Sequence, residues 1–249
     1  MNFPITLHFS NFPPIHLHLL FELLAYSGAF RWYQFLRKRS IDLISEEHRL
    51  WIFVGATAGG LMGSRLIGIL EHPDLLIHFH WTYLITNKTI LGGLLGGLIG
   101  VELTKKRLGV NSSSGDLMTF PLILGMAIGR FGCFAEGLED GTYGIVSSLP
   151  WAINFGDGLL RHPTQLYDIF FLGGLAYVLL LLEKKLVFKN GTRFKLFFIS
   201  YLIYRFFIEF LKPNNFYIGG LCAIQVACLL GLCYYSYVTY KNPSFFEHE

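Results

Sequence analysis

Seven long apolar runs constrain the fold of this chain more than any other feature of its sequence. A helix that crosses the hydrocarbon core of a membrane needs about 20 mostly apolar residues, and most of the runs reach that length. The third and sixth runs are short, which predicts helices that are tilted, broken or partly shielded by protein. The sequence therefore predicts an all-α polytopic membrane protein in which residues 1–249 form one integral membrane domain. The runs cover residues of about 16–35, 51–70, 89–104, 117–135, 165–183, 196–211 and 218–240.

The composition excludes the main classes of water-soluble protein. Charged residues make up 15% of the chain and hydrophobic residues 53%, with a mean hydropathy of +0.47, whereas soluble domains carry about 25% charged residues. These values argue against a soluble enzyme, a disordered protein and a coiled coil. The net charge of +3 is too small to indicate a nucleic-acid partner.

The distribution of Lys and Arg predicts the orientation in the membrane. With the N-terminus outside, the inner segments hold 13 of the 20 basic residues and the outer segments hold only Lys88, Arg161 and Lys212. Because basic residues accumulate on the cytoplasmic side, we expect an outer N-terminus, a cytoplasmic C-terminus and external loops at about 71–88 and 136–164. The inner segments are 36–50, 105–116, 184–195 and 241–249.

Four arginines lie within or at the ends of the predicted spans, namely Arg31, Arg65, Arg130 and Arg205. Arg31 lies one turn from the cytoplasmic basic cluster, so we expect its side chain to snorkel. The other three need another explanation. A charge inside a bilayer costs several kcal/mol unless it is paired or hydrated, so such residues are functional candidates. Arg130 and Arg205 both fall toward the outer half, where two planar guanidinium groups could clamp a phosphate. The structural alternatives are that Arg130 pairs with a loop carboxylate and that Arg205 pairs with Glu209 one turn away.

A polar face on the first predicted helix carries His18, Glu22 and Tyr26 at intervals of four residues. Glu22 needs a partner inside the membrane, and His18 is the nearest candidate in sequence. The pair could be structural, or it could transfer a proton or bind a lipid headgroup. The histidines at 78 and 80 have no further ligands at metal-binding spacing, so we expect no metal.

Two other motifs allow both a structural and a functional interpretation. Gly92, Gly96 and Gly100 repeat every four residues, which is typical of closely packed membrane helices, although a face without side chains could also admit a lipid headgroup or acyl chain. Arg161 and His162 precede Pro163, which favours the first turn of a helix. The N-terminus of that helix would face outward and favour an anion.

These motifs together resemble those of the prolipoprotein diacylglyceryl transferase family. The resemblance extends in family order across residues of about 18–240, and its two most specific strings surround Arg130 and follow Arg161. The matching strings are Gly63-Ser64-Arg65-Leu66, Gly96-Gly97-Leu98-Ile99-Gly100-Val101, Gly129-Arg130-Phe131-Gly132-Cys133-Phe134, Arg161-His162-Pro163-Thr164-Gln165-Leu166-Tyr167 and Tyr204-Arg205-Phe206-Phe207-Ile208-Glu209-Phe210.

The resemblance implies a seven-span protein of the bacterial cytoplasmic (inner) membrane that needs no cofactor. Its expected partners are membrane lipids, phosphatidylglycerol and a preprolipoprotein with a lipobox. Its expected reaction transfers diacylglyceryl to the lipobox cysteine, forms a thioether and releases glycerol phosphate. The residues expected to act in catalysis are Arg130, Arg205, His162, Glu209, Glu22 and His18. The residues expected to bind substrate are Arg130, Arg205, Arg161, Gly141, Gly144, Tyr26, Arg65 and Gln165.

Three features depart from the family pattern. In the loop after the fourth span, Glu136-Gly137-Leu138-Glu139-Asp140 stands where the family usually has an Asn-Gly-Glu pattern. Cys133 stands where the family usually has Asn, and Leu95 stands where it commonly has a histidine before the Gly-Gly pair. We therefore expect His162, or His18 together with Glu22, to accept the proton of the acceptor thiol.

The sequence is also compatible with other functions. A family paralogue could use a different acceptor or lipid, and a non-enzymatic relative could bind lipid only. A transporter or channel would also place arginines in the membrane, but these proteins usually contain internal repeats, and the sequence has none that we detect.

Overall fold

The computed structural model describes residues 3–9, 12–40, 42–72, 87–214 and 219–241. Within these ranges the chain forms seven α-helices, and each of the seven apolar runs overlaps one of them. A 3₁₀ turn, η2, extends α7 over Glu209–Leu211. The helices are α1 (Leu17–Arg39), α2 (Glu46–Glu71), α4 (Ile90–Leu108), α5 (Asp116–Glu136), α6 (Thr164–Lys185), α7 (Thr192–Ile208) and α8 (Ala223–Lys241).

Four of the described helices are long and apolar enough to cross a membrane, namely α2, α5, α6 and α8. The sixth apolar run was expected to be short, and its helix α7 has only 17 residues before the 3₁₀ turn. The chain is therefore a mostly helical membrane protein, as the sequence predicted. The predicted loop at 71–88 lies largely outside the described residues, as do the histidines at 78 and 80.

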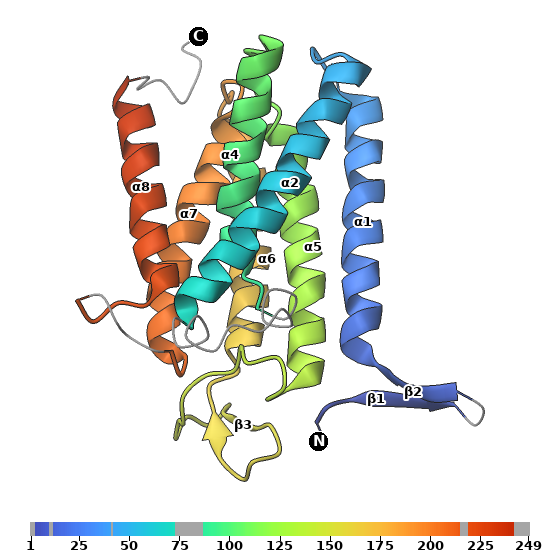
Figure 1. The fold of residues 1–249 in the computed structure, drawn as a ribbon, viewed down its shortest axis with the longest axis vertical. Helices are drawn as coiled ribbons and strands as arrows, with labels where there is room; N and C mark the ends of the chain where they lie inside the picture. The colour runs from blue at the N-terminus through green and yellow to red at the C-terminus, as the bar shows by residue number, and fades with distance from the viewer. Residues whose placement is uncertain (1–2, 10–11, 41, 73–86, 215–218, 242–249) are drawn as a thin grey trace.

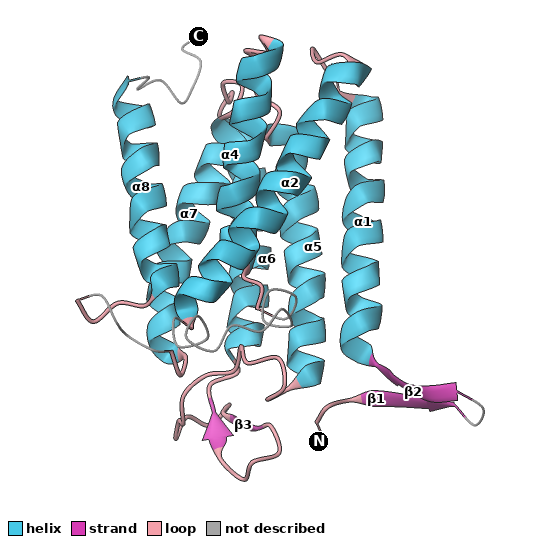
Figure 2. Cartoon of the chain, in the orientation of Figure 1, coloured by secondary structure: helices cyan, strands magenta, loops and turns pink. Residues whose placement is uncertain are grey.

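The helices stand side by side, and strand β1 (Thr6–Phe9) and the last turn of α8 lie at opposite ends of the bundle (Figure 1). The described strands gather at the end where the chain begins (Figure 2), which we call the hairpin end. They form two short antiparallel pairs that the all-α expectation did not include. These strands are β1 (Thr6–Phe9), β2 (Phe12–His16), β3 (Ile153–Asn154) and β4 (Leu160–Arg161).

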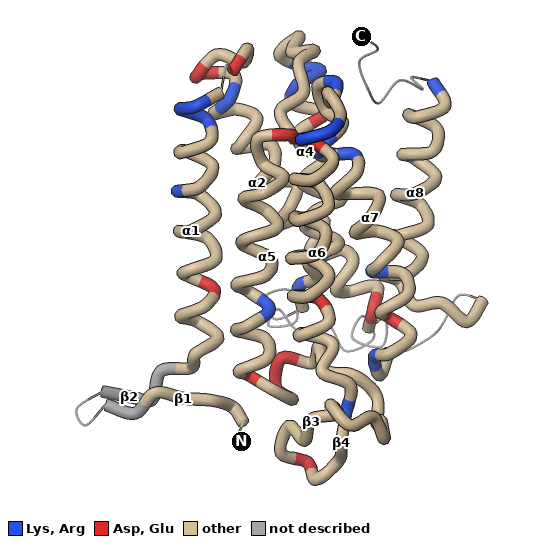
Figure 3. Tube along the Cα trace, turned by 180° about the vertical axis from the view of Figure 1, so that it is seen from behind, with Lys and Arg blue, Asp and Glu red and all other residues tan. Residues whose placement is uncertain are grey.

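Lysines and arginines gather at the other end (Figure 3), which we call the basic end. There α1, α4 and α6 finish, and cations in the last turn of a helix are favoured by its dipole. The basic residues in these last turns are Arg37, Lys38, Arg39, Lys105, Lys106, Arg107, Lys184 and Lys185.

Glycines on both helices allow α2 and α4 to pack backbone against backbone. A Cβ atom added to Gly59 would lie 2.2 Å from the carbonyl oxygen of Gly96, and one added to Gly96 would lie 2.2 Å from that of Gly59. No side chain fits at such distances, so the helix-packing interpretation of the α4 glycines is confirmed. Gly93 and Gly97, on the neighbouring face of α4, line a mostly apolar cavity of about 220 Å³.

A second close approach joins α1 to α5. A Cβ atom on Gly132 would lie 3.2 Å from the carbonyl oxygen of His18 and 3.0 Å from the Cβ of Phe21. The absence of a side chain at Gly132 therefore brings His18 beside the last turns of α5, where Arg130 and Cys133 lie.

Candidate active site

A buried ion pair between two helices forms the first part of the candidate site. The Nε atom of Arg130 on α5 lies 2.6 Å from Oδ2 of Asp168 on α6, and the two residues are 4% and 3% exposed. The partner of Arg130 is therefore a helix carboxylate and not the loop carboxylate that we considered. Asp168 was not among the predicted site residues, although it is an acidic residue inside the apolar run 165–183.

The second part lies where α7 ends. Arg205 forms an ion pair with Glu209, as the spacing of one helical turn predicted. Lys212 Nζ lies 3.3 Å from Oε1 of the same carboxylate, and Asn214 Nδ2 donates a hydrogen bond of 2.6 Å to its other oxygen. Arg205 Nη1 also lies 3.9 Å from Asp168 Oδ2, so the two parts form one charged cluster.

The charged cluster carries more positive than negative charge. It contains three cations and two carboxylates, which leaves a formal excess of one positive charge in a site where no member is more than 5% exposed. Nε and Nη1 of Arg205 are buried and have no hydrogen-bond partner among the described residues. Because buried donors cost free energy when they are left unsatisfied, the arrangement favours an anion beside Arg205. The cluster consists of Arg130, Asp168, Arg205, Glu209 and Lys212.

The loop between α5 and α6 is anchored to the end of α7 through Gly144. Its N–H donates to the carbonyl of His162 at 2.9 Å, and the next N–H, that of Ile145, donates to the carbonyl of Leu211 at 2.8 Å. A Cβ atom at Gly144 would lie 2.5 Å from the Cβ of His162. Gly141 needs to be glycine for another reason, because its φ of +70° lies in the left-handed region.

The Arg161 motif lies at the start of α6, as the sequence predicted. Arg161 is paired with Asp157 at 2.6 Å, and its guanidinium lies 5.0 Å from the ring centroid of Tyr143. The hydrogen bond from Arg161 holds the pKa of the Asp157 carboxyl below its ordinary value. Arg161 therefore stabilises the loop and is not part of the charged cluster.

His162 and Gln165 occupy different environments near the same helix start. His162 Nδ1 lies 3.1 Å from the hydroxyl of Tyr167, which also accepts a hydrogen bond from Trp151 Nε1 at 2.8 Å. Gln165 is fully buried, and neither its amide nitrogen nor its amide oxygen has a partner within the described part of the chain. Such an unsatisfied amide, three residues before Asp168, is available to a bound polar ligand.

The polar face on α1 is divided between different partners. Glu22 accepts a hydrogen bond of 3.0 Å from Lys88, so the expected pairing of Glu22 with His18 is wrong. His18 Nδ1 instead lies 3.9 Å from Oδ1 of Asp140 in the loop after α5. Tyr26 is 70% exposed on the bundle surface and does not reach the charged cluster. Sequence spacing placed these residues on one face but could not show which helix that face meets.

Arg65 lies apart from the charged cluster. It is half-buried on α2, and its Nη1 atom has no hydrogen-bond partner among the described residues. The described ion pairs of the charged cluster do not include it.

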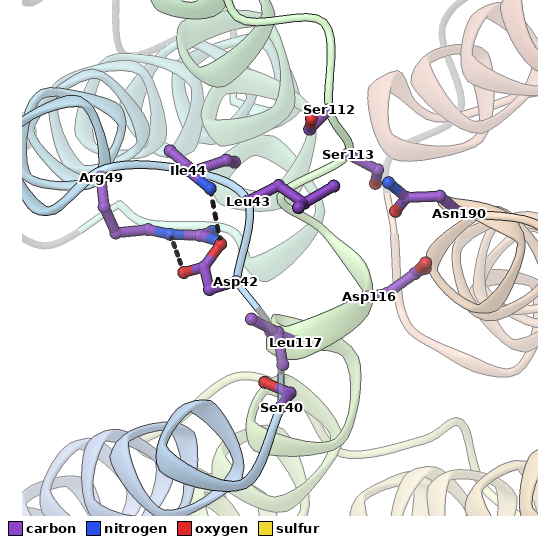
Figure 4. A pocket seen from close by; sticks show the side chains of 10 residues that line it. All are labelled: Ser40, Asp42, Leu43, Ile44, Arg49, Ser112, Ser113, Asp116, Leu117 and Asn190. Atoms are coloured by element: carbon purple, nitrogen blue, oxygen red, sulfur yellow. Dashed lines mark hydrogen bonds and ion pairs between the residues drawn. The ribbon is translucent and has the colours of Figure 1, made fainter.

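A polar cavity of about 200 Å³ lies at the basic end. Figure 4 shows the Asp42 carboxylate facing Arg49, with Ser113 and Asp116 on the other side of the cavity. None of the residues that line it belongs to the predicted site. The cavity is therefore separate from the charged cluster, which lies at the hairpin end.

Comparisons with known proteins identify the family of this chain. The model of the prolipoprotein diacylglyceryl transferase family matches residues 4–240. A phosphatidylglycerol–prolipoprotein diacylglyceryl transferase of Finegoldia magna is 34% identical over 76% of this chain and 76% of its own length. A protein of the same name from Clostridioides difficile is 30% identical over 83% of this chain and 84% of its own length. Another from Pseudomonas aeruginosa is 32% identical over 83% of this chain and 79% of its own length. This chain therefore belongs to the prolipoprotein diacylglyceryl transferase family.

Proposed function

We propose that this protein transfers the diacylglyceryl group of phosphatidylglycerol to the lipobox cysteine of a preprolipoprotein. The observation that carries the proposal is the buried charged cluster with its excess positive charge and the open donors of Arg205. The phosphodiester of phosphatidylglycerol has one negative charge, which would neutralise that excess. Family membership and the names of the relatives support the same reaction.

The charged cluster can assist the reaction at its leaving group. The thiolate sulfur of the acceptor attacks the glyceryl carbon that is bonded to the phosphate oxygen, and a C–S bond forms as the C–O bond breaks. The bonding electrons leave on that oxygen, so glycerol phosphate departs with an additional negative charge. Arg130 and Arg205 would bind this charge more strongly in the transition state than in the ground state, which accelerates the reaction.

Two histidines are candidates to accept the proton of the acceptor thiol. His18 lies within reach of Asp140, and its buried Nδ1 atom has no hydrogen-bond partner in the described part of the chain. His162 is already hydrogen-bonded to Tyr167. We therefore place His18 before His162 as the base. Glu22 bonds to Lys88, which favours a structural role for that carboxylate.

We further infer that the hairpin end faces the outside of a bacterial cytoplasmic membrane. The positive-inside rule supports this orientation, because the last turns of three helices carry the Lys and Arg residues of the basic end. The charged cluster and the 136–164 loop would then meet substrates at the outer surface. Residues 1–249 would form a single membrane domain.

The proposal can be tested with purified protein in phosphatidylglycerol vesicles and a lipobox peptide. Mass spectrometry is expected to show a diacylglyceryl mass gain on the peptide cysteine, lost in Arg130→Ala and Arg205→Ala. Arg107→Ala is the matched control, because that arginine is exposed at the basic end and its removal should preserve turnover. Folded protein that binds the lipid but never modifies the peptide would contradict the proposal.

One observation favours a second candidate, a paralogue with another acceptor or lipid. Leu95, at the position where the family commonly has a histidine, packs against the apolar core, and a Cβ atom on Gly231 would lie 3.3 Å from its Cδ2. The described charged cluster therefore contains no group from this position. Turnover of a different thiol or phospholipid in the same assay, without turnover of the lipobox peptide, would identify the paralogue.

A further inference from the structure

Three potential metal ligands meet beside the charged cluster. A ring nitrogen of His18, the Sγ atom of Cys133 and a carboxylate oxygen of Asp140 all lie within 4.8 Å of one another. They come from α1, from α5 and from the loop after α5. No short-range sequence motif links them, and packing through Gly132 brings α1 to this place.

We propose that His18, Cys133 and Asp140 bind a Zn²⁺ ion that activates the acceptor thiol. This inference rests on the proposed transferase function and changes one role in it. With the ion bound, His18 is a metal ligand, and the ion takes the place of a histidine base in activating the thiol. Zinc in catalytic sites typically has three protein ligands drawn from His, Cys and carboxylates, and its fourth position stays open for a water or a substrate. The set in this chain has that number and those ligand types.

The geometry requires only a modest closure around the ion. Zinc bonds of about 2.0–2.3 Å place tetrahedral ligand atoms roughly 3.3–3.6 Å apart. His18 Nδ1 and Asp140 Oδ1 are already 3.9 Å apart, and that histidine nitrogen is buried without a hydrogen-bond partner among the described residues. The other ligand atoms lie within 4.8 Å of one another, so side-chain rotations would have to bring them about 1 Å closer to complete the set.

The surrounding charges suit a dication bound to a thiolate. Arg130 Nη1 lies 3.8 Å from Cys133 Sγ, where its positive charge would attract a metal-bound thiolate. The charge of Arg130 itself is offset by Asp168 at 2.6 Å. The thiolate of Cys133 and the carboxylate of Asp140 then neutralise the two charges of Zn²⁺, while His18 binds as a neutral ligand.

The bound ion supplies a nucleophile without a strong base. The acceptor thiol occupies the fourth position and gives its proton to water, because a thiol that coordinates zinc is deprotonated. Its sulfur then attacks the glyceryl carbon, the C–S bond forms, and the C–O electrons leave with glycerol phosphate beside Arg130. The neutral thioether is a weaker ligand than the thiolate and leaves the ion. No oxidant or reductant is consumed.

Cobalt substitution tests the site independently of catalysis. Metal-free protein titrated with Co²⁺ is expected to bind about one ion and to show a thiolate-to-cobalt absorption band. Cys133→Asn, which restores the usual family residue, should abolish the band. Cys233→Ser should leave it unchanged, because Cys233 is exposed on α8. His18→Ala and Asp140→Asn each remove one ligand, which should weaken binding at least about 100-fold, since even changes to supporting residues cost 10–100-fold.

The outcomes separate this inference from the proposed function. Absence of the band in folded protein, or its persistence in Cys133→Asn, would overturn the zinc site even if the lipobox peptide is modified. Loss of the metal from His16→Ala but not from His18→Ala would place the ion on the other set, His16 with Glu136 and Glu139, and would also overturn the proposed zinc site.

A chelator tests whether the ion takes part in the reaction. Transfer that falls at least tenfold with a chelator and returns with Zn²⁺ would support activation of the thiol by the ion, whereas transfer that a chelator leaves unchanged would exclude it. Metal binding without any transfer would leave the site standing and refute the proposed reaction.

Discussion

At the scale of single residues, the shape of the Arg205 side chain matters as much as its charge. Its Nη2 atom pairs with Glu209, whereas Nε and Nη1, the latter 3.9 Å from Asp168, have no hydrogen-bond partner among the described residues. Lysine keeps the charge but lacks the planar fork that binds two phosphate oxygens at once.

We therefore expect Arg205→Lys to lower kcat by about 10²–10³, which is the usual cost of losing one transition-state donor. Release of glycerol phosphate from phosphatidylglycerol vesicles measures this change. Arg107→Lys, at the exposed end of α4, is the matched control and should retain the full rate. An unchanged rate in Arg205→Lys would mean that charge alone is sufficient.

At the scale of helices, the contact between α2 and α4 depends on backbone atoms that no side chain separates. Gly96→Ala would place a methyl group 2.2 Å from the carbonyl oxygen of Gly59, so the helices must move apart. We expect a loss of about 1–3 kcal/mol, typical of overpacking, measured as a lower Tm in detergent. Gly173→Ala on α6 is the control, because a Cβ atom there has no neighbour within 4 Å. Equal Tm values for the two variants would refute the close-packing argument.

The connection between α1 and α2 depends on a partly buried carboxylate. Burial raises the pKa of Asp42, but the hydrogen bonds from Arg49, from the Ile44 N–H and from Arg37 outweigh it and hold this pKa below its ordinary value. Arg49 Nε and Arg37 Nε both donate to Asp42 Oδ2 at 3.1 Å. The carboxylate therefore stabilises the fold above the unfolded pKa of about 3.9, and this contribution is lost as the pH falls through the lower folded pKa.

Asp42→Asn should accordingly lower the stability at neutral pH by about 2 kcal/mol, the usual contribution of hydrogen bonds to a charged group. The difference in Tm between the variant and the native protein should shrink as the pH falls below about 4. Thermal unfolding in detergent between neutral and acidic pH measures both effects. A difference that stays constant over this range would contradict the assignment.

At the scale of the whole molecule, the separation of charge predicts which end faces the cytoplasm. Ser148 is exposed in the 136–164 loop at the hairpin end, and Lys106 is exposed at the basic end. In a Cys233→Ser background, a membrane-impermeant thiol reagent should label Ser148→Cys in intact spheroplasts. It should label Lys106→Cys only after the membrane is opened. The reverse pattern would invert the proposed orientation.

The sequence by itself determined the helices and the main cations of the site. Apolar runs predict membrane helices because a helix that spans the bilayer needs a continuous stretch of apolar residues, and the sequence shows such a stretch directly. Arg130 and Arg205 stood out because a charge within such a run is costly wherever the helix packs. The pairing of Arg205 with Glu209 was also predictable, since residues four apart in a helix are always neighbours.

Only the tertiary structure decided which helix faces meet, and therefore which residues are partners. Asp168 reaches Arg130 because α6 lies against α5, and Glu22 meets Lys88 and not His18. The set of His18, Cys133 and Asp140 exists because Gly132 lets α1 approach α5. Helical periodicity fixes the side chains that share a face, but the contacts between helices depend on packing across the whole bundle, which no local pattern in the sequence records.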